Sequence, residues 1–344
     1  MSTRQLGNKR APTTTVAPNG PLGIGSEGAT ETCQPVANAT RRLNRNPSTA
    51  ARRKTTGGAV HSGAEMRSPA SDGASTAAAE TRAARVIAFA NQKGGVGKTT
   101  STITLGACLA ELGYRVLVTD MDPQGGCGIG LGVEPSTLEL SIYNLLLDRN
   151  CAAADVLQKT SIPNLDLLPS NIDLAAAELM LVQEVAREHS LRRVLEPLNL
   201  DYDFILIDCP PSLGLLTING LSAADGVIIP LECEYYALRG MALLLDSIDR
   251  VTELLNPRLV IDGILPTMYD GRTLHGREVL GRVKEAFGAK VFEVIIRKTI
   301  RFAEAPVVGE PIVHYAPGSP GAAAYRELAQ EVIARVASRQ TAGS

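Results

Sequence analysis

Short apolar runs alternate with segments of helical periodicity from about residue 83 to the end of the chain. The runs have the length of buried strands and are predicted at Val86–Ala90, Arg115–Thr119, Leu165–Leu168, Phe204–Ile207, Val227–Ile229, Ile261–Leu265 and Val294–Ile296. Helices are predicted between and after them, at Thr102–Leu112, Leu174–Glu184, Ser190–Leu195, Leu238–Leu255, Glu278–Phe287 and Ala322–Val336. This order predicts an α/β fold with a doubly wound, mostly parallel sheet and helices on both faces.

The first 82 residues have a different composition, rich in Ala, Thr, Ser, Gly and Pro, and no sustained periodicity. Such a sequence buries too little apolar surface to offset the entropy of ordering, so we expect residues 1–82 to form a disordered tail. One globular domain is expected over 83–338, followed by a short polar tail over 339–344. Whether translation starts at Met1 or Met66 is left open by the sequence.

Charge divides the chain in the same way. Residues 1–85 contain twelve Lys/Arg and five Asp/Glu, a charge of +7, which leaves −9 for the remainder of a chain whose net charge is −2. Basic clusters at Arg41-Arg42 and Arg52–Lys54 could contact DNA or anionic lipid, or the tail could simply increase solubility.

Composition excludes several classes of protein. The chain has 344 residues, is 44% hydrophobic and contains no Trp, so its core must be aliphatic. Its six cysteines show no paired metal-binding spacing, which favours reduced thiols in a cytoplasmic protein. No apolar run reaches the ~20 residues of a membrane span, and no signal-peptide pattern is present.

A glycine-rich loop follows the first predicted strand and opens a helix. Strand, glycine loop and helix N-terminus together form a cradle for phosphate, because backbone N–H groups and the helix dipole point at the anion. Lys98 is expected to reach the β- and γ-phosphates, and the Thr99 hydroxyl to bind Mg²⁺. Gln92 occupies the position where the usual pattern has glycine, and a second lysine lies within the loop. The predicted nucleotide-binding residues are Lys93, Gly94, Gly95, Val96, Gly97, Lys98, Thr99 and Thr100.

Carboxylates follow two other predicted strands. Asp120 and Asp122 end the second strand, and Asp208 ends the apolar run Phe204–Ile207. In a doubly wound sheet these strand ends lie beside the phosphate loop, where a carboxylate can hold Mg²⁺. The predicted metal-binding residues are Thr99, Asp120 and Asp208.

These motifs resemble the deviant Walker A group of P-loop ATPases, and in particular the ParA/Soj partitioning ATPases. The resemblance rests on the two-lysine loop, the DxDPQG sequence at Asp120–Gly125 and the apolar strand ending in Asp208-Cys-Pro-Pro. It extends from about Arg85 to the C-terminus through LPSNIDLAAAE (168–178), ECEYYALRG (232–240), TMYDGRT (267–273) and RFAEAP (301–306).

The resemblance implies a slow, switch-like ATP hydrolase with ATP and Mg²⁺ as cofactors. It gives Lys93, Lys98 and Asp122 catalytic roles: Lys93 reaches the nucleotide of the partner in a sandwich homodimer, and Asp122 positions the attacking water. Asp120 supports Lys98 and the Mg²⁺ shell. The implied partners are non-specific DNA and a DNA-bound ParB-type protein, with a nucleoid-associated location and no integral membrane segment.

The DNA-binding surface is less well defined by the sequence. ParA proteins usually carry Ile-Pro-Arg-Asn where this chain has Ile296–Thr299, and a basic helix position is here Asp249, with Arg250 beside it. The DNA-binding candidates are Arg250, Arg272, Arg297, Lys298 and Arg301. A MinD-like spatial regulator and an iron–sulfur carrier are alternatives, but the C-terminal pattern predicts a core-packing helix, and Cys151 and Cys209 fit no cluster pattern.

Overall fold

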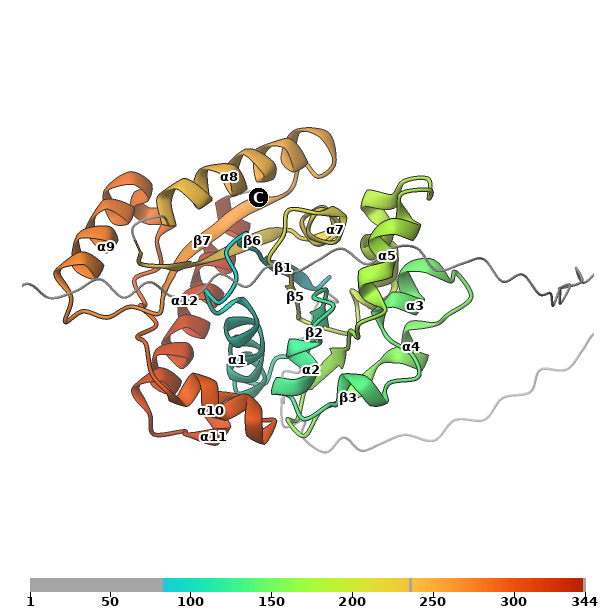
Figure 1. Cartoon of the computed structure of the whole chain (residues 1–344), viewed down its shortest axis with the longest axis horizontal. Coiled ribbons are helices and arrows are strands. Elements are labelled where there is room, and N and C mark those ends of the chain that lie inside the picture. Colours follow the sequence, from blue (N-terminus) through green and yellow to red (C-terminus); the bar gives the residue numbers. More distant parts are fainter. Residues whose placement is uncertain (1–82, 235–236, 343–344) are drawn as a thin grey trace, which may run out of the picture. The chain divides into compact units, whose positions relative to one another are not determined.

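A computed structural model describes residues 83–234 and 237–342, so the expected tail over 1–82 lies outside the described residues. The chain forms a seven-stranded sheet in the order β3-β4-β2-β5-β1-β6-β7 (Figure 1). The strands are β1 (Arg85–Phe89), β2 (Val116–Asp120), β3 (Gln158–Lys159), β4 (Leu165–Leu168), β5 (Phe204–Asp208), β6 (Gly226–Glu232) and β7 (Val260–Thr267). Only β3 is antiparallel to its neighbour among the pairs formed by these strands. The predicted mostly parallel, doubly wound sheet is confirmed.

Helices cover both faces of the sheet. One face packs under α7 (Leu215–Ala223) and α8 (Ala237–Leu254), and the other under α1 (Lys98–Glu111) and α12 (Pro320–Ala342). The other α-helices in the described part of the chain are α2 (Gly126–Gly130), α3 (Ile142–Leu147), α4 (Ala153–Val156), α5 (Leu174–Leu181), α6 (Ser190–Leu195), α9 (Leu274–Phe287), α10 (Arg301–Val308) and α11 (Ile312–Tyr315). The core is aliphatic, as the composition requires.

One predicted strand is wrong. Residues Val294–Ile296 form no strand, although the segment follows the edge of β7. Phe292 N donates to Ile264 O at 2.9 Å and Ile296 N donates to Pro266 O at 2.9 Å. Between these two hydrogen bonds the segment advances four residues while β7 advances two, so the regular pairing of a strand cannot continue.

The C-terminal helix α12 is part of the core, as its pattern predicted. Tyr325, Leu328 and Val332 are buried, and the Tyr325 hydroxyl lies 2.8 Å from Ser101 Oγ on α1. The helix continues through Ala342. No helix in the described part of the chain is long and apolar enough to cross a membrane.

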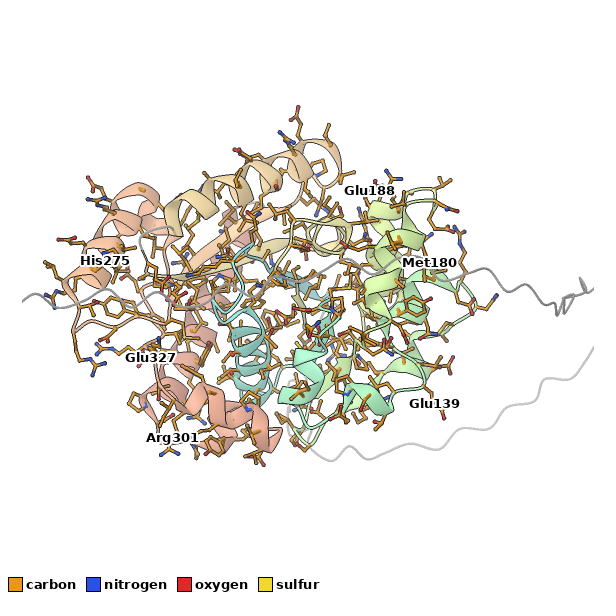
Figure 2. All side chains as sticks on the ribbon, in the orientation of Figure 1. Glu139, Met180, Glu188, His275, Arg301 and Glu327 are labelled. Carbon is orange, nitrogen blue, oxygen red and sulfur yellow. The ribbon has the colours of Figure 1, made fainter. Side chains whose placement is uncertain are left out.

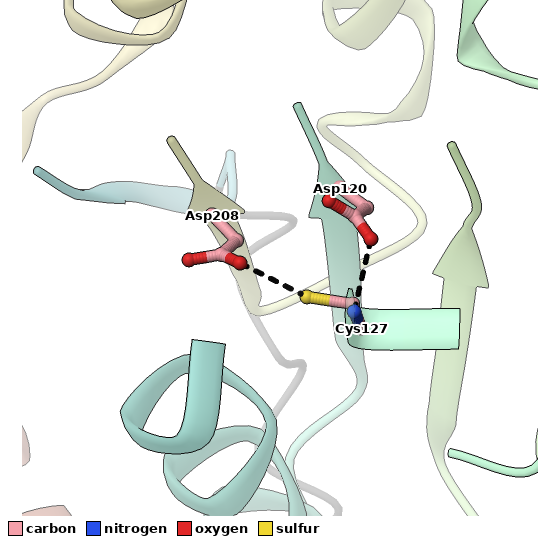
Figure 3. A group of neighbouring side chains, drawn as sticks. All are labelled: Asp120, Cys127 and Asp208. Atoms are coloured by element: carbon pink, nitrogen blue, oxygen red, sulfur yellow. Dashed lines mark hydrogen bonds between the residues drawn. The ribbon is translucent and has the colours of Figure 1, made fainter. Parts of the chain in front are cut away.

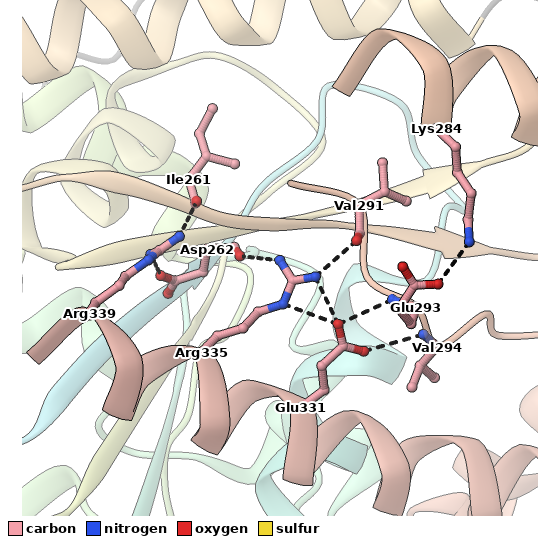
Figure 4. A network of polar contacts seen from close by, with 9 residues as sticks. All are labelled: Ile261, Asp262, Lys284, Val291, Glu293, Val294, Glu331, Arg335 and Arg339. Atoms are coloured by element: carbon pink, nitrogen blue, oxygen red, sulfur yellow. Dashed lines mark hydrogen bonds and ion pairs between the residues drawn. The ribbon is translucent and has the colours of Figure 1, made fainter. Parts of the chain in front are cut away.

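Arginine side chains fasten α12 to the β7 edge (Figure 4). Arg335 donates to Asp262 O at 3.1 Å and Val291 O at 2.9 Å, pairs with Glu331 at 2.8 Å and stacks over the Phe292 ring. Because charged donors to buried carbonyls are expensive to remove, this side chain should contribute measurably to stability.

We expect Arg335→Ala to lower the free energy of unfolding by about 1.5–3 kcal/mol, since two carbonyls and one carboxylate lose their charged donor. Urea denaturation would measure it. Arg282→Ala, an exposed substitution on α9, is the matched control. A loss at position 335 no larger than in the control would show that the network contributes nothing net.

Candidate nucleotide-binding site

Three neighbouring strands end at one edge of the sheet. β5 lies between β1 and β2, and its last residue Asp208 is in register with Phe89 on one side and Asp120 on the other. The glycine loop leaves β1 at this edge. The parallel sheet thus brings together the motifs that the sequence separates by up to about 110 residues.

The glycine loop is fixed at both ends. Gly95 and Gly97 have φ of 75° and 83°, a left-handed backbone that other residues adopt only with strain, and Gly97 caps the start of α1. Asn91 Nδ2 donates to Pro230 O at 2.7 Å, and Asn91 Oδ1 accepts from Lys93 N at 3.0 Å. Thr267 Oγ1 donates to Val96 O at 2.8 Å. Sequence analysis assigned no role to the side chains of Asn91 and Thr267, because the carbonyls to which they donate, Pro230 O and Val96 O, are distant along the chain.

Lys98 and Thr99 begin α1 and turn toward the strand ends. Lys98 is buried, and its Nζ donates to Lys93 O at 3.3 Å within the loop. Burial lowers the pKa of Lys98, although the nearby Asp208 charge opposes this. Thr99 Oγ1 donates to Asp208 Oδ2 at 2.6 Å. Lys98 and Thr99 thus lie beside the end of β5, and their contacts with phosphate and Mg²⁺ stay predictions.

Asp120 and Asp208 form a fully buried pair of carboxylates with Cys127 (Figure 3). Cys127 N donates to Asp120 Oδ2 at 2.9 Å, and Cys127 Sγ lies 3.6 Å from Asp208 Oδ2. Burial raises the pKa of Asp208 to about 6 and that of Asp120 well above its ordinary value. A nearby carboxylate, Asp208 for Asp120 and Asp122 for Asp208, raises each pKa further. Neither forms an ion pair within residues 83–234 and 237–342.

A divalent cation fits this arrangement. Two buried carboxylates without a paired cation are costly unless they are neutralised, and carboxylate and hydroxyl oxygens are the ligands that Mg²⁺ prefers. Thr99, Asp120 and Asp208 could thus hold Mg²⁺ directly or through water. Cys127 was not predicted, because no sequence spacing links it to Asp208. Burial raises the pKa of its thiol, and sulfur is a soft ligand that suits Mg²⁺ less well than carboxylate oxygen does.

Asp122 lies in a constrained turn beside the pair. Asp122 N donates to Asp120 Oδ1 at 3.0 Å, Asp122 Oδ1 accepts from Gln124 N at 3.1 Å, and Ser170 Oγ donates to Asp122 O. Gly125 closes the turn with φ of 66°, and a Cβ there would come within 2.5 Å of Pro135. The half-buried Asp122 carboxylate is therefore held near the site with its position set by the backbone.

Lys93 points away from its own phosphate loop toward the end of β6. Its Nζ lies 2.6 Å from Glu232 Oε2 and 2.6 Å from Glu234 Oε2. Partial burial disfavours the charged amine, but the two carboxylates outweigh it and the pKa of Lys93 is raised. Sequence reasoning assigned no role to these glutamates, because they are 139 and 141 residues from Lys93 along the chain.

Two segments bring most of the DNA-binding candidates together. Tyr269 and Arg297 form an isolated parallel bridge, and Lys298 N donates to Tyr269 O at 3.1 Å, which places Arg297 and Lys298 beside the turn that carries Arg272. The Arg272 side chain is 91% exposed and pairs with Asp270 at 2.8 Å.

The other two candidates come from α10 and α8. Arg301 begins α10, two residues after Thr299, and projects outward in Figure 2. Arg250 lies on α8, whose exposed side also carries Asp246, Asp249 and Glu253. That acidic setting separates Arg250 from the other candidates.

Comparison with known proteins agrees with this geometry. A family model described as an AAA domain matches residues 84–261. The sporulation initiation inhibitor protein Soj of Bacillus subtilis is 49% identical over 250 residues, which cover 73% of this chain and 98% of Soj. The chromosome partitioning protein ParA of Caulobacter vibrioides is 45% identical, over 74% of this chain and 96% of ParA. The chain belongs to the ParA/Soj family of ATPases.

A solved relative of this ParA/Soj-family protein contains a nucleotide. It is a Mycobacterium smegmatis protein named cobyrinic acid a,c-diamide synthase, with bound ADP and magnesium. The two chains are 44% identical and superpose with a TM-score of 0.64. The match covers 72% of this chain and 93% of the Mycobacterium smegmatis chain. The P-loop ATPase fold that the ParA/Soj resemblance implied is confirmed.

We expect Lys98→Ala to weaken MgATP binding by about 10- to 100-fold, the worth of one charge-assisted contact to phosphate. Isothermal titration calorimetry would measure it. Lys93→Ala is the matched loop control and should keep most of the affinity, because Lys93 contacts Glu232 and Glu234 in its own chain. Equal affinity of the two variants would contradict the assignment of Lys98.

Proposed function

We propose that this ParA/Soj-family chain hydrolyses ATP as a switch that controls a homodimer, its DNA binding and its response to a ParB-type partner. The observation that carries the proposal is the convergence of Lys98 and Thr99 with the buried Asp120–Asp208 pair at one sheet edge. Phosphoryl transfer needs mainly positioning and charge neutralisation, and this arrangement supplies both.

The residues take distinct parts in this proposal. Lys98 and the loop amides bind the β- and γ-phosphates, while Thr99, Asp120 and Asp208 hold Mg²⁺, which supplies charge neutralisation when bound. The Asp122 carboxylate orients the attacking water and accepts its proton. Its fixed turn supports this role, since a small misplacement of a positioning group is costly in rate.

Lys93 couples hydrolysis to assembly. In the monomer its amine is satisfied by Glu232 and Glu234 of its own chain. To reach a nucleotide in a second copy, the amine must leave these two carboxylates. The exchange opposes dimerisation, and because the ion pairs are partly exposed, its cost is small enough for bound ATP to outweigh.

We expect Asp122→Ala to keep ATP binding and ATP-dependent dimerisation but to lose hydrolysis by about 100-fold or more, since general-base and orientation effects are of that size. Phosphate release and analytical ultracentrifugation with ATP would measure the two properties. Gln124→Ala, on the exposed side of the same turn, is the control. Wild-type turnover in Asp122→Ala would reject both the residue's role and the proposed chemistry.

In this proposal Lys93 has two alternative contacts: the two glutamates of its own chain and the nucleotide of a second copy. The double variant Glu232→Gln, Glu234→Gln should raise the dimer fraction at limiting ATP, because Lys93 is released, whereas Lys93→Ala should lower both dimer and hydrolysis. Sedimentation across an ATP titration would show the shift. Glu285→Gln with Glu293→Gln, both exposed, controls for the charge change. A double variant that dimerises less than wild type would mean that the glutamates help to position Lys93.

DNA binding is proposed for the surface formed by Arg272, Arg297, Lys298 and Arg301. Contacts to phosphates should make log affinity fall with log salt at about −0.9 per phosphate neutralised. With ATP, Arg272→Glu should weaken binding to duplex DNA and make this slope shallower. Arg149→Glu, on an exposed side chain outside the group, is the matched charge change. Equal effects of the two variants in a fluorescence anisotropy titration would contradict the placement of the surface.

A further inference from the structure

The thiol of Cys127 lies beside the buried carboxylates and takes no part in the function proposed above. Its Sγ lies 3.6 Å from Asp208 Oδ2, and Sγ and one oxygen from each of Asp120 and Asp208 all lie within 4.8 Å of one another. All three side chains are fully buried (Figure 3). Mg²⁺ prefers oxygen ligands and has no use for the thiol, whereas one sulfur with two carboxylates is a donor set that suits a softer cation.

The spacing of these groups fits zinc. Zn²⁺ binds thiolate sulfur at about 2.3 Å and carboxylate oxygen at about 2.0–2.2 Å in a tetrahedral arrangement, so a sulfur and an oxygen on one ion lie about 3.5 Å apart. The distance between Cys127 Sγ and Asp208 Oδ2 is 3.6 Å. A thiol that donates to the carboxylate has the same spacing, so the ion can replace the thiol proton, which passes to solvent.

The backbone holds the thiol at this place. Cys127 N donates to Asp120 Oδ2 at 2.9 Å, so the residue that supplies the sulfur is fastened to one of the carboxylates. The preceding residue, Gly126, lies so close to Thr99 that a Cβ at position 126 would come within 3.0 Å of Thr99 Cγ2. Thr99 Oγ1 lies 2.6 Å from Asp208 Oδ2, so this hydroxyl or a water can take the fourth position.

We propose that Asp120, Cys127 and Asp208 bind Zn²⁺ when no nucleotide is bound. The two carboxylates and the thiolate carry three negative charges, of which the ion neutralises two. The ammonium of Lys98, which interacts with Asp208, offsets the third. Sulfur strengthens the binding of Zn²⁺ and adds nothing for Mg²⁺, so Cys127 shifts the preference of the site toward zinc.

Zinc binding would make the chain sensitive to this metal. Asp120 and Asp208 are also the carboxylates proposed to hold Mg²⁺, so an ion bound to them and to Cys127 should compete with MgATP. Competition rests on the proposed function, because it requires that Mg²⁺ use the same carboxylates. Zinc binding itself requires only the three side chains.

Co²⁺ is the probe for the test, because it takes the place of Zn²⁺ in sites of this kind and a thiolate bound to it absorbs in the near ultraviolet. In a titration of the full chain, reduced and free of nucleotide, we expect a band that saturates at about one Co²⁺ per chain. An equal concentration of Zn²⁺ should remove the band, and the same concentration of Mg²⁺ should not. Cys127→Ala should abolish the band and weaken Zn²⁺ binding, measured against a chromophoric chelator, by about 10-fold or more.

The matched control is Cys108→Ala, which removes another buried thiol, on α1. It should keep both the band and the affinity for Zn²⁺. Thermal denaturation would verify that the variants are folded, and Cys127→Ser, which keeps the volume of the side chain, would replace an unfolded Cys127→Ala. No band in the unaltered chain, a band that persists without the Cys127 thiol, or equal loss in the control would overturn the proposal.

A second measurement separates the zinc site from the proposed function. Saturating Zn²⁺ should weaken MgATP binding to the unaltered chain by about 10-fold or more in calorimetry, and should have a smaller effect on Cys127→Ala. Undiminished MgATP binding to a chain that shows the cobalt band would mean that Mg²⁺ does not use Asp120 and Asp208. That result would refute the Mg²⁺ site of the proposed function and leave the zinc site standing.

Discussion

The structure depends on two buried carboxylates that face each other across neighbouring strands. Asp120 and Asp208 are in register at the ends of β2 and β5, and both are inaccessible to water. Like charges at this separation in a low-dielectric setting repel, so this edge of the sheet is incomplete as a purely protein structure. The hydroxyl of Thr99, the amide and thiol of Cys127 and the amide of Asp122 each relieve part of that cost. The site is thus built to gain free energy from a cation, which links nucleotide binding to the stability of the sheet edge.

Much of this architecture can be predicted from local sequence. The apolar runs that became β1, β2, β5, β6 and β7 contain Val, Ile or Thr, which favours strands, whereas β4 was predicted from its apolar run alone. The phosphate loop could also be predicted, because glycines followed by a lysine at the start of a helix are typical of a phosphate-binding site. Gly95 and Gly97 do have positive φ in the structure. Asp208 could be placed because a strand end is where a parallel sheet presents its functional groups.

Contacts between distant segments were not predictable. Glu232 and Glu234 are 139 and 141 residues from Lys93, and no local pattern connects them. Nothing in the local sequence distinguishes Cys127 from the other cysteines. Its contact with Asp208 follows only from the pairing of β2 with β5. The strand predicted at Val294–Ile296 was wrong for a related reason: Ile296 is buried beside β7, but the hydrogen bonds of the segment are too unevenly spaced for a strand. Burial can be inferred from composition, whereas register depends on the neighbouring segment.

That irregular segment has a consequence for assembly. The outer edge of β7 would otherwise present a row of free amides and carbonyls, the usual template on which a second sheet adds a strand. Here Ile264 and Pro266 already accept hydrogen bonds from the 291–298 segment, and the far edge of the sheet is the two-residue β3. Neither edge offers a long, straight run for pairing. In the proposed homodimer, two copies would therefore meet through side chains rather than by extending the sheet from one copy into the other.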